Sequence, residues 1–291
     1  MDVSVIIINY NTLNLTKNTI KSVLEKTKDV SIEIILVDNN SADGSREYFD
    51  NIEEIKFIKN VENIGFGNAN NIGLKESKGK YVFFLNSDTI LINNAIKILF
   101  EFMENNLEAG VCGGNLYYED LSPGHSFEEN IFGLKDEFKN FYKFLYKKIY
   151  KKRLDFNYSL KYKEVGYVTG ADMFVRKEVL DKLGGFDSDF FMYYEETELT
   201  NRIKKLGYRI YSVPQAKIIH LEGKSSEYKE LKFKMMTESK YKYFYKVHGK
   251  KMMKYSYFLS QFKYLLLPIK INRIKLKLNR KIYKKIDLEY R

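Results

Sequence analysis

The first hundred residues alternate short, almost continuously apolar runs with longer segments whose apolar positions recur at helical spacing. The run Val3–Ile8 is rich in β-branched side chains, as expected for a strand buried on both faces of a sheet. Three later runs predict strands of the same kind: Ile32–Val37, Ile55–Ile58 and Tyr81–Leu85. The intervening and following segments predict helices over 13–28, from 42 onward with Ser41 as the cap, over 69–77 and over 93–104.

Strands that alternate with helices predict a mostly parallel α/β sheet with right-handed crossovers. In open sheets of this kind, ligands bind beyond the carboxyl ends of the strands. Polar clusters stand at three of these predicted ends: Asn9–Asn11, Asp38–Asn40 and Asn86–Asp88. The sequence therefore predicts a ligand site at this edge of the sheet.

The second half of the chain is less regular. Residues 119–164 mix aromatic and lysine side chains without a clear period, which indicates an inserted loop-and-helix region. Beyond it, the pattern predicts a strand over 166–176 and a helix over 195–206 that stops at Gly207. Two further strands are predicted over 208–213 and 216–220.

Charge separates the chain into two parts. The 291 residues carry a formal net charge of +11, but residues 229–291 hold 19 Lys or Arg against 4 Asp or Glu. Residues 1–228 therefore hold 30 basic and 34 acidic side chains. A basic tail indicates a polyanionic partner such as a membrane surface, although a solubilising tail fits the same composition. We thus expect a catalytic domain over 1–228 and a basic, aromatic-rich extension over 229–291.

Composition otherwise describes an ordinary globular protein, with 44% hydrophobic and 30% charged residues. The single cysteine, Cys112, forms no intrachain disulfide, which suits a reducing compartment. No signal peptide and no apolar run long enough to span a membrane is recognised, so we expect a cytoplasmic protein.

Two of the candidate chemical groups follow strands. Asp88 ends a polar turn after an aromatic-rich strand, where a carboxylate can bind a divalent cation that also holds substrate phosphates. His220 ends a later strand and could ligate the same ion or hold a phosphate. A turn-forming aspartate and a structural histidine are the plainer interpretations of each residue taken alone.

An acidic cluster opens the helix predicted after residue 194: Glu195, Glu196 and Glu198. Carboxylates in a first helical turn stabilise the helix dipole, which is one interpretation. Carboxylates that lie near one another beside aromatic walls also gain a raised pKa, which improves them as general bases. A Gly-x-Gly sequence at Gly65 and Gly67 precedes another helix, but its third glycine position is Asn70, so we reject a dinucleotide site.

Taken in order, these segments resemble the inverting family-2 glycosyltransferases, which have the GT-A fold, and most closely the rhamnosyltransferase-like subgroup. The similar segments are Val5–Asn11, Val37–Ser45, Asn63–Phe66 with Asn71, Asn86–Asp88, Gly170–Ala171 with Arg176, Gly184–Asp187, Tyr194–Leu199, and His220 with Gly223, Ser225 and Ser226. The resemblance covers about residues 3–228.

The resemblance implies a role for each segment. Tyr10 would pack on a nucleobase, Asp38 would accept from its N–H, and Asn86 would contact the ribose. Asp88 and His220 would hold Mg²⁺ or Mn²⁺ with the diphosphate, and Glu196 would deprotonate the acceptor hydroxyl. The other residues expected to bind substrate are Asn9, Asn11, Asn39, Asn63, Gly65, Phe66, Asn71, Gly170 and Ala171.

Two positions depart from the family pattern. Asn86 replaces the first Asp of the D-x-D metal motif, and Glu196 replaces the usual Asp base with a side chain one methylene longer. Because catalysis is sensitive to displacements of about 1 Å, Glu195 or Glu198 stays open as the base.

The resemblance implies transfer of a sugar, with rhamnose favoured, from a dTDP- or UDP-sugar to a hydroxyl of a glycan or lipid-linked acceptor. The basic tail would then dock on the inner face of the cell membrane, or pack as helices on the catalytic domain or on another subunit; no motif for nucleic acid accompanies it. A sugar-nucleotide nucleotidyltransferase is an alternative, but no Gly-rich basic phosphate loop follows the first strand. A non-catalytic binding module is another alternative.

Overall fold

The computed structural model describes residues 1–136, 152–221, 229–265 and 269–290. The strands are β1 (Val3–Asn9), β2 (Ile32–Asp38), β3 (Ile55–Lys59), β4 (Tyr81–Asn86), β5 (Thr89–Leu91), β6 (Ala109–Tyr117), β7 (Phe127–Glu128), β8 (Lys163–Glu164), β9 (Tyr167–Val168), β10 (Asp172–Arg176) and β11 (Arg209–His220). The helices that flank them are α1 (Leu13–Lys26), α2 (Ser45–Phe49), α3 (Phe66–Lys75), α4 (Ala95–Asn105), α6 (Lys177–Leu183) and α7 (Glu195–Lys205).

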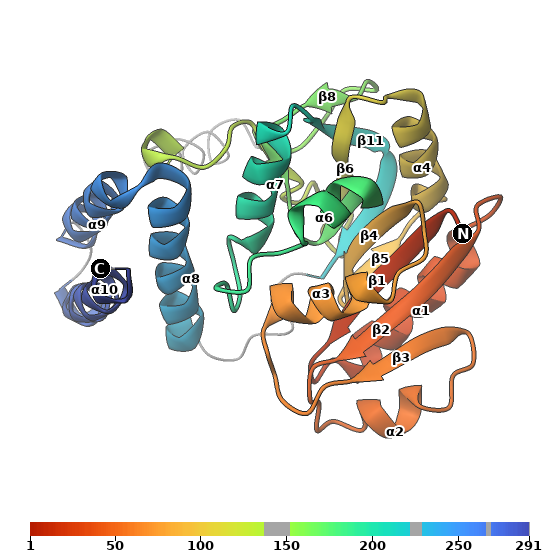
Figure 1. Cartoon of the computed structure of the whole chain (residues 1–291), viewed down its shortest axis with the longest axis horizontal. Helices are drawn as coiled ribbons and strands as arrows, with labels where there is room; N and C mark the ends of the chain where they lie inside the picture. The colour runs from red at the N-terminus through yellow and green to blue at the C-terminus, as the bar shows by residue number, and fades with distance from the viewer. Residues whose placement is uncertain (137–151, 222–228, 266–268, 291) are drawn as a thin grey trace.

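The central sheet has nine strands, in the order β3-β2-β1-β4-β10-β6-β11-β5 with β8 also paired to β11 (Figure 1). Strands β1 to β4 are parallel, and β6 is parallel to β11. Strand β10 runs antiparallel between β4 and β6, and β5 runs antiparallel to β11. The predicted mostly parallel α/β sheet is therefore confirmed, with antiparallel strands added in the second half.

Side chains alternate between the two faces of the sheet, so each strand contributes to two cores. In β1, Val5 and Ile7 pack in the core that α1 and α4 cover. Ile6 and Ile8 pack in the opposite core, beneath α3, α6 and α7. Burial on both faces explains why these strands are almost continuously apolar.

The structure corrects several predicted boundaries. The segment 166–176 is divided into β9 and β10, while 208–213 and 216–220 form the single strand β11, whose register shifts between Ser212 and Lys217 around Pro214. Helix α2 begins at Ser45 after Gly44, which has φ of +85°, so Ser41 is not its cap. Helix α3 begins at Phe66, three residues before the predicted start.

Strand β6 and helix α6 had no predicted counterpart. Strand β6 contains three glycines, which lower strand propensity and hide the signal. Gly114 is needed there, because a Cβ at this position would lie 2.6 Å from the carbonyl oxygen of Ala216 on neighbouring β11.

The C-terminal part is helical: α8 (Lys229–Tyr243), a π-helical turn (Phe244–His248), α9 (Lys250–Leu265) and α10 (Ile269–Glu289). These helices gather at one side of the molecule (Figure 1). They share an apolar cluster with Phe190, and Phe132 and Tyr194 pack against it. The predicted helical extension is confirmed, whereas its boundary at residue 228 stays a prediction. No helix in the described residues is long and apolar enough to cross a membrane.

Candidate active site

The antiparallel pairing of β5 with β11 brings Asp88 and His220 together. The register places His220 opposite Thr89, and the backbone N–H of Leu221 donates to the carbonyl of Asp88 at 2.9 Å. The Nε2 of His220 lies 3.2 Å from Oδ1 of Asp88. The two residues predicted as metal ligands therefore lie side by side, although they are far apart in the chain.

Asn86 completes this corner of the site. Its Nδ2 lies 3.3 Å from Nε2 of His220, and its buried Oδ1 has no hydrogen-bond partner in the described residues. An amide oxygen, a carboxylate and an imidazole are all suitable ligands for Mg²⁺ or Mn²⁺. The donor set thus fits the ion that the family resemblance implies. Gly223, Ser225 and Ser226 of the same motif lie outside the described residues.

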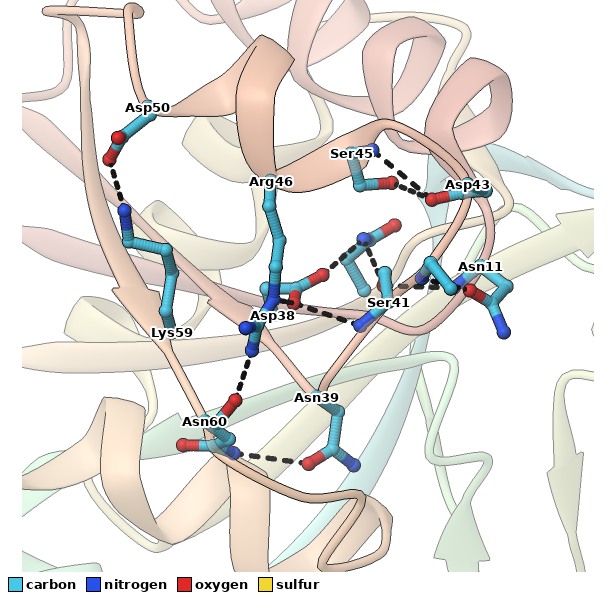
Figure 2. Close-up of polar contacts among 12 residues, drawn as sticks. Asn11, Asp38, Asn39, Ser41, Asp43, Ser45, Arg46, Asp50, Lys59 and Asn60 are labelled. Atoms are coloured by element: carbon cyan, nitrogen blue, oxygen red, sulfur yellow. Dashed lines mark hydrogen bonds and ion pairs between the residues drawn. The ribbon is translucent and has the colours of Figure 1, made fainter.

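Asp38 is buried at the end of β2 in a hydrogen-bond network (Figure 2). Its Oδ1 accepts from Nδ2 of Asn9 at 2.8 Å, and its Oδ2 accepts from the N–H of Ser41 at 3.0 Å and from Nε of Arg46 at 2.7 Å. Burial alone would raise the pKa of Asp38, but the bonds from Ser41, Arg46 and Asn9 outweigh it and hold the pKa below its usual range. Arg46 was not identified from the sequence, because nothing local shows that it reaches back to Asp38.

A second network fixes the loops beyond β2 and β3. Buried Asn39 donates to Oδ1 of Asn63 at 2.7 Å, and Oδ1 of Asn63 also accepts from the N–H of Gly65 at 3.0 Å. Gly65 has φ of +87°, and a Cβ on it would lie 2.3 Å from the carbonyl oxygen of Phe191. The same oxygen accepts from the N–H of Phe66 at 2.8 Å. Only glycine allows this loop to approach the segment before α7 so closely.

Of the residues in the first loop, Tyr10 and Asn11 are exposed and Asn9 is buried. The Oδ1 of Asn11 accepts from the N–H of Ala42 at 2.7 Å, which ties the first loop to the second. The ring of Tyr10 is 47% exposed, enough to stack on a ligand.

Three predicted residues from separate segments meet near the opening of α7. A Cβ built on Gly170 would lie 3.5 Å from Cβ of Glu196 and 3.8 Å from the ring of Phe66. The neighbouring carbonyl of Ala171 accepts from the N–H of Asn86 at 3.0 Å. The segment between β9 and β10 therefore connects the Asp88 corner with the acidic cluster.

The side chain of Asn71, which was expected to bind substrate, forms hydrogen bonds with the protein backbone. Its amide donates to the carbonyl of Phe186 and accepts from the N–H of Phe186, both at 2.8 Å. It thus clamps the loop after α6 onto α3.

The three glutamates of α7 have different surroundings. Glu198 forms an ion pair with Arg202 at 2.8 Å and is anchored there. Glu195 is buried, and its Oε2 has no hydrogen-bond partner in the described residues. Glu196 is half-buried. Burial raises the pKa of both Glu195 and Glu196, and the charge of Glu196 adds to the effect on Glu195.

Strained backbone leads into this cluster. Tyr193 and Tyr194 have φ of +72° and +68°, a conformation that costs a non-glycine residue about 1 kcal/mol or more. Tyr194 is held in place by Phe132 and Tyr243, whose rings lie 5.4 and 5.5 Å from its own. The C-terminal helices thereby support the loop that presents Glu195 and Glu196.

Comparison with known proteins gives a consistent picture. The family model described as glycosyl transferase family 2 matches residues 4–184. An uncharacterized glycosyltransferase of Rickettsia bellii is 37% identical over 139 residues, covering 45% of this chain and 20% of that protein. The N-acetylglucosaminyl-diphospho-decaprenol L-rhamnosyltransferase of Mycobacterium tuberculosis is 34% identical over 64 residues, covering 22% of this chain and 21% of that protein. The chain therefore spans about a fifth of the length of these relatives.

Two solved structures are similar over almost the whole chain. The mannosyltransferase PcManGT from Pyrobaculum calidifontis, in complex with GDP-Man and Mn²⁺, has a TM-score of 0.57 and 15% identity, with 96% of this chain and 73% of that chain covered. GalNAc-T7 with UDP, GalNAc and Mn²⁺ has a TM-score of 0.61 and 17% identity, with 97% and 54% covered. These similarities confirm the predicted GT-A fold.

Proposed function

Since the chain belongs to glycosyl transferase family 2 and is a glycosyltransferase, we propose that it transfers a sugar, with inversion, from a nucleoside-diphosphate sugar to an acceptor hydroxyl. The observation that carries this proposal is a series of neighbouring residues: Asp88 and Asn86 both lie beside His220, Asn86 bonds to Ala171, and the adjacent Gly170 lies near Glu196. The proposed donor site and the proposed base would therefore lie on the two sides of the short segment between β9 and β10.

The donor would lie along the carboxyl ends of β1, β2 and β4. The exposed ring of Tyr10 would stack on the base, and the loops of Asn11, Asn63 and Phe66 would border it. These loops would be held in place by three side chains that are buried in the two hydrogen-bond networks: Asn9, Asp38 and Asn39. An Mg²⁺ or Mn²⁺ ion held by Asp88, His220 and Asn86 would supply positive charge to the leaving diphosphate.

Glu196 is our proposed base. It is half-buried, lies beside Gly170 and Phe66, and its pKa is raised by burial, so it accepts a proton more readily than an ordinary glutamate. Glu198 is a weaker choice because Arg202 holds its carboxylate. Glu195 is a weaker choice because it is only 4% exposed. The acceptor oxygen would lose its proton to Glu196 as it attacks the anomeric carbon, and the diphosphate would leave from the opposite face.

For the donor we propose a dTDP- or UDP-sugar, with rhamnose favoured, and for the acceptor a glycan or lipid-linked glycan of a cell-envelope polysaccharide. The similarity to a rhamnosyltransferase named for a lipid-diphosphate acceptor supports this choice. A transfer assay tests it: UDP- and dTDP-sugars are offered with a lipid-diphosphate sugar, and NMR assigns the anomeric configuration of the product. Acceptor-dependent product of inverted configuration is expected, and a product of retained configuration would overturn the mechanism.

The same acceptor choice agrees with a surface on α9. One stripe of this helix exposes Tyr255, Phe258, Phe262 and Leu265, each between 45 and 63% exposed, and α9 contains no acidic residue. Lysines flank the stripe, with Lys254 lying 6.0 Å from the ring of Phe258. Exposed aromatic side chains among lysines suit an anionic lipid surface, where each lysine contributes about 1 kcal/mol.

Vesicle flotation tests this membrane contact. Wild type is expected to float with phosphatidylglycerol vesicles and not with phosphatidylcholine vesicles, and the double variant Phe258→Glu, Phe262→Glu is expected to stay in solution. Val61→Glu is the control, because Val61 is an even more exposed apolar residue, at 91% exposure, in the loop after β3. Equal flotation of the double variant and wild type would contradict a role for the stripe.

A further inference from the structure

A second group of metal-ligand side chains lies outside the Asp88 corner. It comprises His125, Glu128 and Asp155, whose ligand atoms all lie within 4.8 Å of one another. The Nε2 of His125 is 3.2 Å from Oε1 of Glu128 and 3.9 Å from Oδ2 of Asp155. Ligands about 2.0–2.2 Å from a shared ion are separated by about 3–4 Å, so these spacings suit a single cation.

The imidazole of His125 lies within ion-pair distance of both carboxylates, but its Nε2 forms no hydrogen bond of good geometry with either. Its Nε2 is buried and has no hydrogen-bond partner of good geometry in the described residues. A buried nitrogen is costly to leave unsatisfied, and a cation between it and the carboxylates would remove that cost. We propose that His125, Glu128 and Asp155 bind a divalent cation, Zn²⁺ or Mn²⁺, at a second site distinct from Asp88 and His220.

The backbone holds the three ligands in place before any ion arrives. The N–H of Ser126 donates to the carbonyl of Asp155 at 3.0 Å, and the N–H of Gly166 donates to the carbonyl of Glu128 at 2.7 Å. Arg153 donates two hydrogen bonds to the carboxylate of Asp155, from Nε to Oδ1 at 2.6 Å and from Nη2 to Oδ2 at 3.0 Å. Such outer contacts orient a ligating carboxylate, and each Asp155 oxygen keeps a second lone pair for the ion.

The cluster lies within electrostatic range of the proposed base. Strand β7, which carries Glu128, pairs with β9, which carries Tyr167. Glu128 and Glu196 both raise the pKa of the buried Tyr167 hydroxyl, after burial itself, so both carboxylates lie near it. The side chains of His125 and Glu128 are 32 and 19% exposed, so solvent reaches the cluster.

Equilibrium dialysis of the full-length Asp88→Ala protein, with Zn²⁺ or Mn²⁺ alone, tests the site without requiring transfer. One ion per chain is expected in this background, and none when either His125→Ala or Glu128→Gln is added. Glu129→Gln is the matched control, because Glu129 is exposed and paired with Lys163. If His125→Ala loses its far-UV circular dichroism, Glu128→Gln decides alone.

The contrary results are equally clear. No bound ion in the Asp88→Ala protein, or an ion retained by Glu128→Gln, would overturn the proposal and leave the cluster as a charge network around His125. Loss of sugar transfer with the ion still bound would leave this site intact and count only against the proposed function.

Discussion

Oδ1 of Asp88 and Nε2 of His220 lie 3.2 Å apart because β5 and β11 pair in a register that sets Thr89 opposite His220. The turn after β4 and the end of β11 are thereby joined at one corner of the sheet. Asn86 adds an amide at the same corner and is bonded through its N–H to Ala171. The corner that holds Asp88 and His220 is therefore bonded to the segment that lies beside Glu196.

Replacement of Glu196 by Gln should reduce kcat by about 10²–10⁴-fold, since it removes the proton acceptor and keeps the shape. Binding of the nucleoside diphosphate should be unchanged, because Glu196 is not among the residues proposed to hold the nucleotide or the ion. The measurement is kcat beside the dissociation constant for the nucleotide, with Glu129→Gln as a control. A Glu196→Gln protein with wild-type kcat would transfer the role to Glu195 or Glu198.

The pH dependence of kcat/KM should show the raised pKa of Glu196. A base works only when deprotonated, so activity should fall as pH is lowered through a value above the usual glutamate pKa of about 4.3. The rate profile is recorded over the range in which circular dichroism shows the protein to be folded. An acid limb at or below the usual glutamate value would contradict the assignment.

Glu195→Gln should make the protein more stable at neutral and alkaline pH. Burial raises the pKa of Glu195 in the folded state. Above the ordinary glutamate pKa the unfolded chain ionises freely, whereas the folded chain keeps the proton or buries the charge, so the free energy of unfolding decreases. The gain should be about 1.4 kcal/mol for each tenfold change in proton affinity, and it should vanish below the ordinary glutamate pKa. Urea unfolding at several pH values measures it; a gain that grows as pH falls would have the wrong sign.

Asp38→Asn should destabilise the fold by about 3 kcal/mol or more, because it leaves the guanidinium of Arg46 beside a neutral group. The Asp50–Lys59 pair is the matched control, since both side chains are about half exposed and Asp50→Asn should cost about 1 kcal/mol or less.

The stability that Asp38 contributes should also depend on pH. Its folded pKa is lowered, so its contribution is present above the unfolded pKa and is lost as pH falls through the folded value. Chemical unfolding of both variants at neutral and acidic pH measures the difference. Equal losses for Asp38→Asn and Asp50→Asn would show that the buried network adds little.

The sequence predicted the first half of the fold well because β1 to β4 are buried on both faces and therefore read as apolar runs. It predicted the second half less well where local signals conflict with packing. The glycines of β6 are required for close contact with β11, but they remove the sequence signal of a strand. Pro214 makes the sequence of β11 look like two strands, whereas the structure accommodates it at a register shift within one strand.

The candidate site shows the same limit. Asp88, His220 and Glu196 could be proposed from their motifs, and parallel strands ending at one edge explain why such motifs meet. Asn39 and Asn71 form hydrogen bonds within the protein, to Asn63 and to Phe186. The sequence could not predict these bonds, because it does not show whether an asparagine in a motif contacts the protein or a substrate. The residues proposed for a second cation site come from two separate parts of the chain, of which only Glu128 lies on a strand, so no periodic pattern relates His125 to Asp155.

The most direct test of the metal-dependent donor site is thermal stabilisation by UDP, dTDP and GDP, with and without Mn²⁺, in wild type, Asp88→Ala and a control. The control is Asp181→Ala, because Asp181 is an exposed carboxylate on α6 that pairs with Lys177. A ligand at 100 times its dissociation constant stabilises the folded state by about 2.7 kcal/mol. We predict a Mn²⁺-dependent rise in Tm with UDP or dTDP that Asp181→Ala keeps and Asp88→Ala loses. An unchanged rise in Asp88→Ala, or no rise with any nucleotide in folded wild type, would contradict the account.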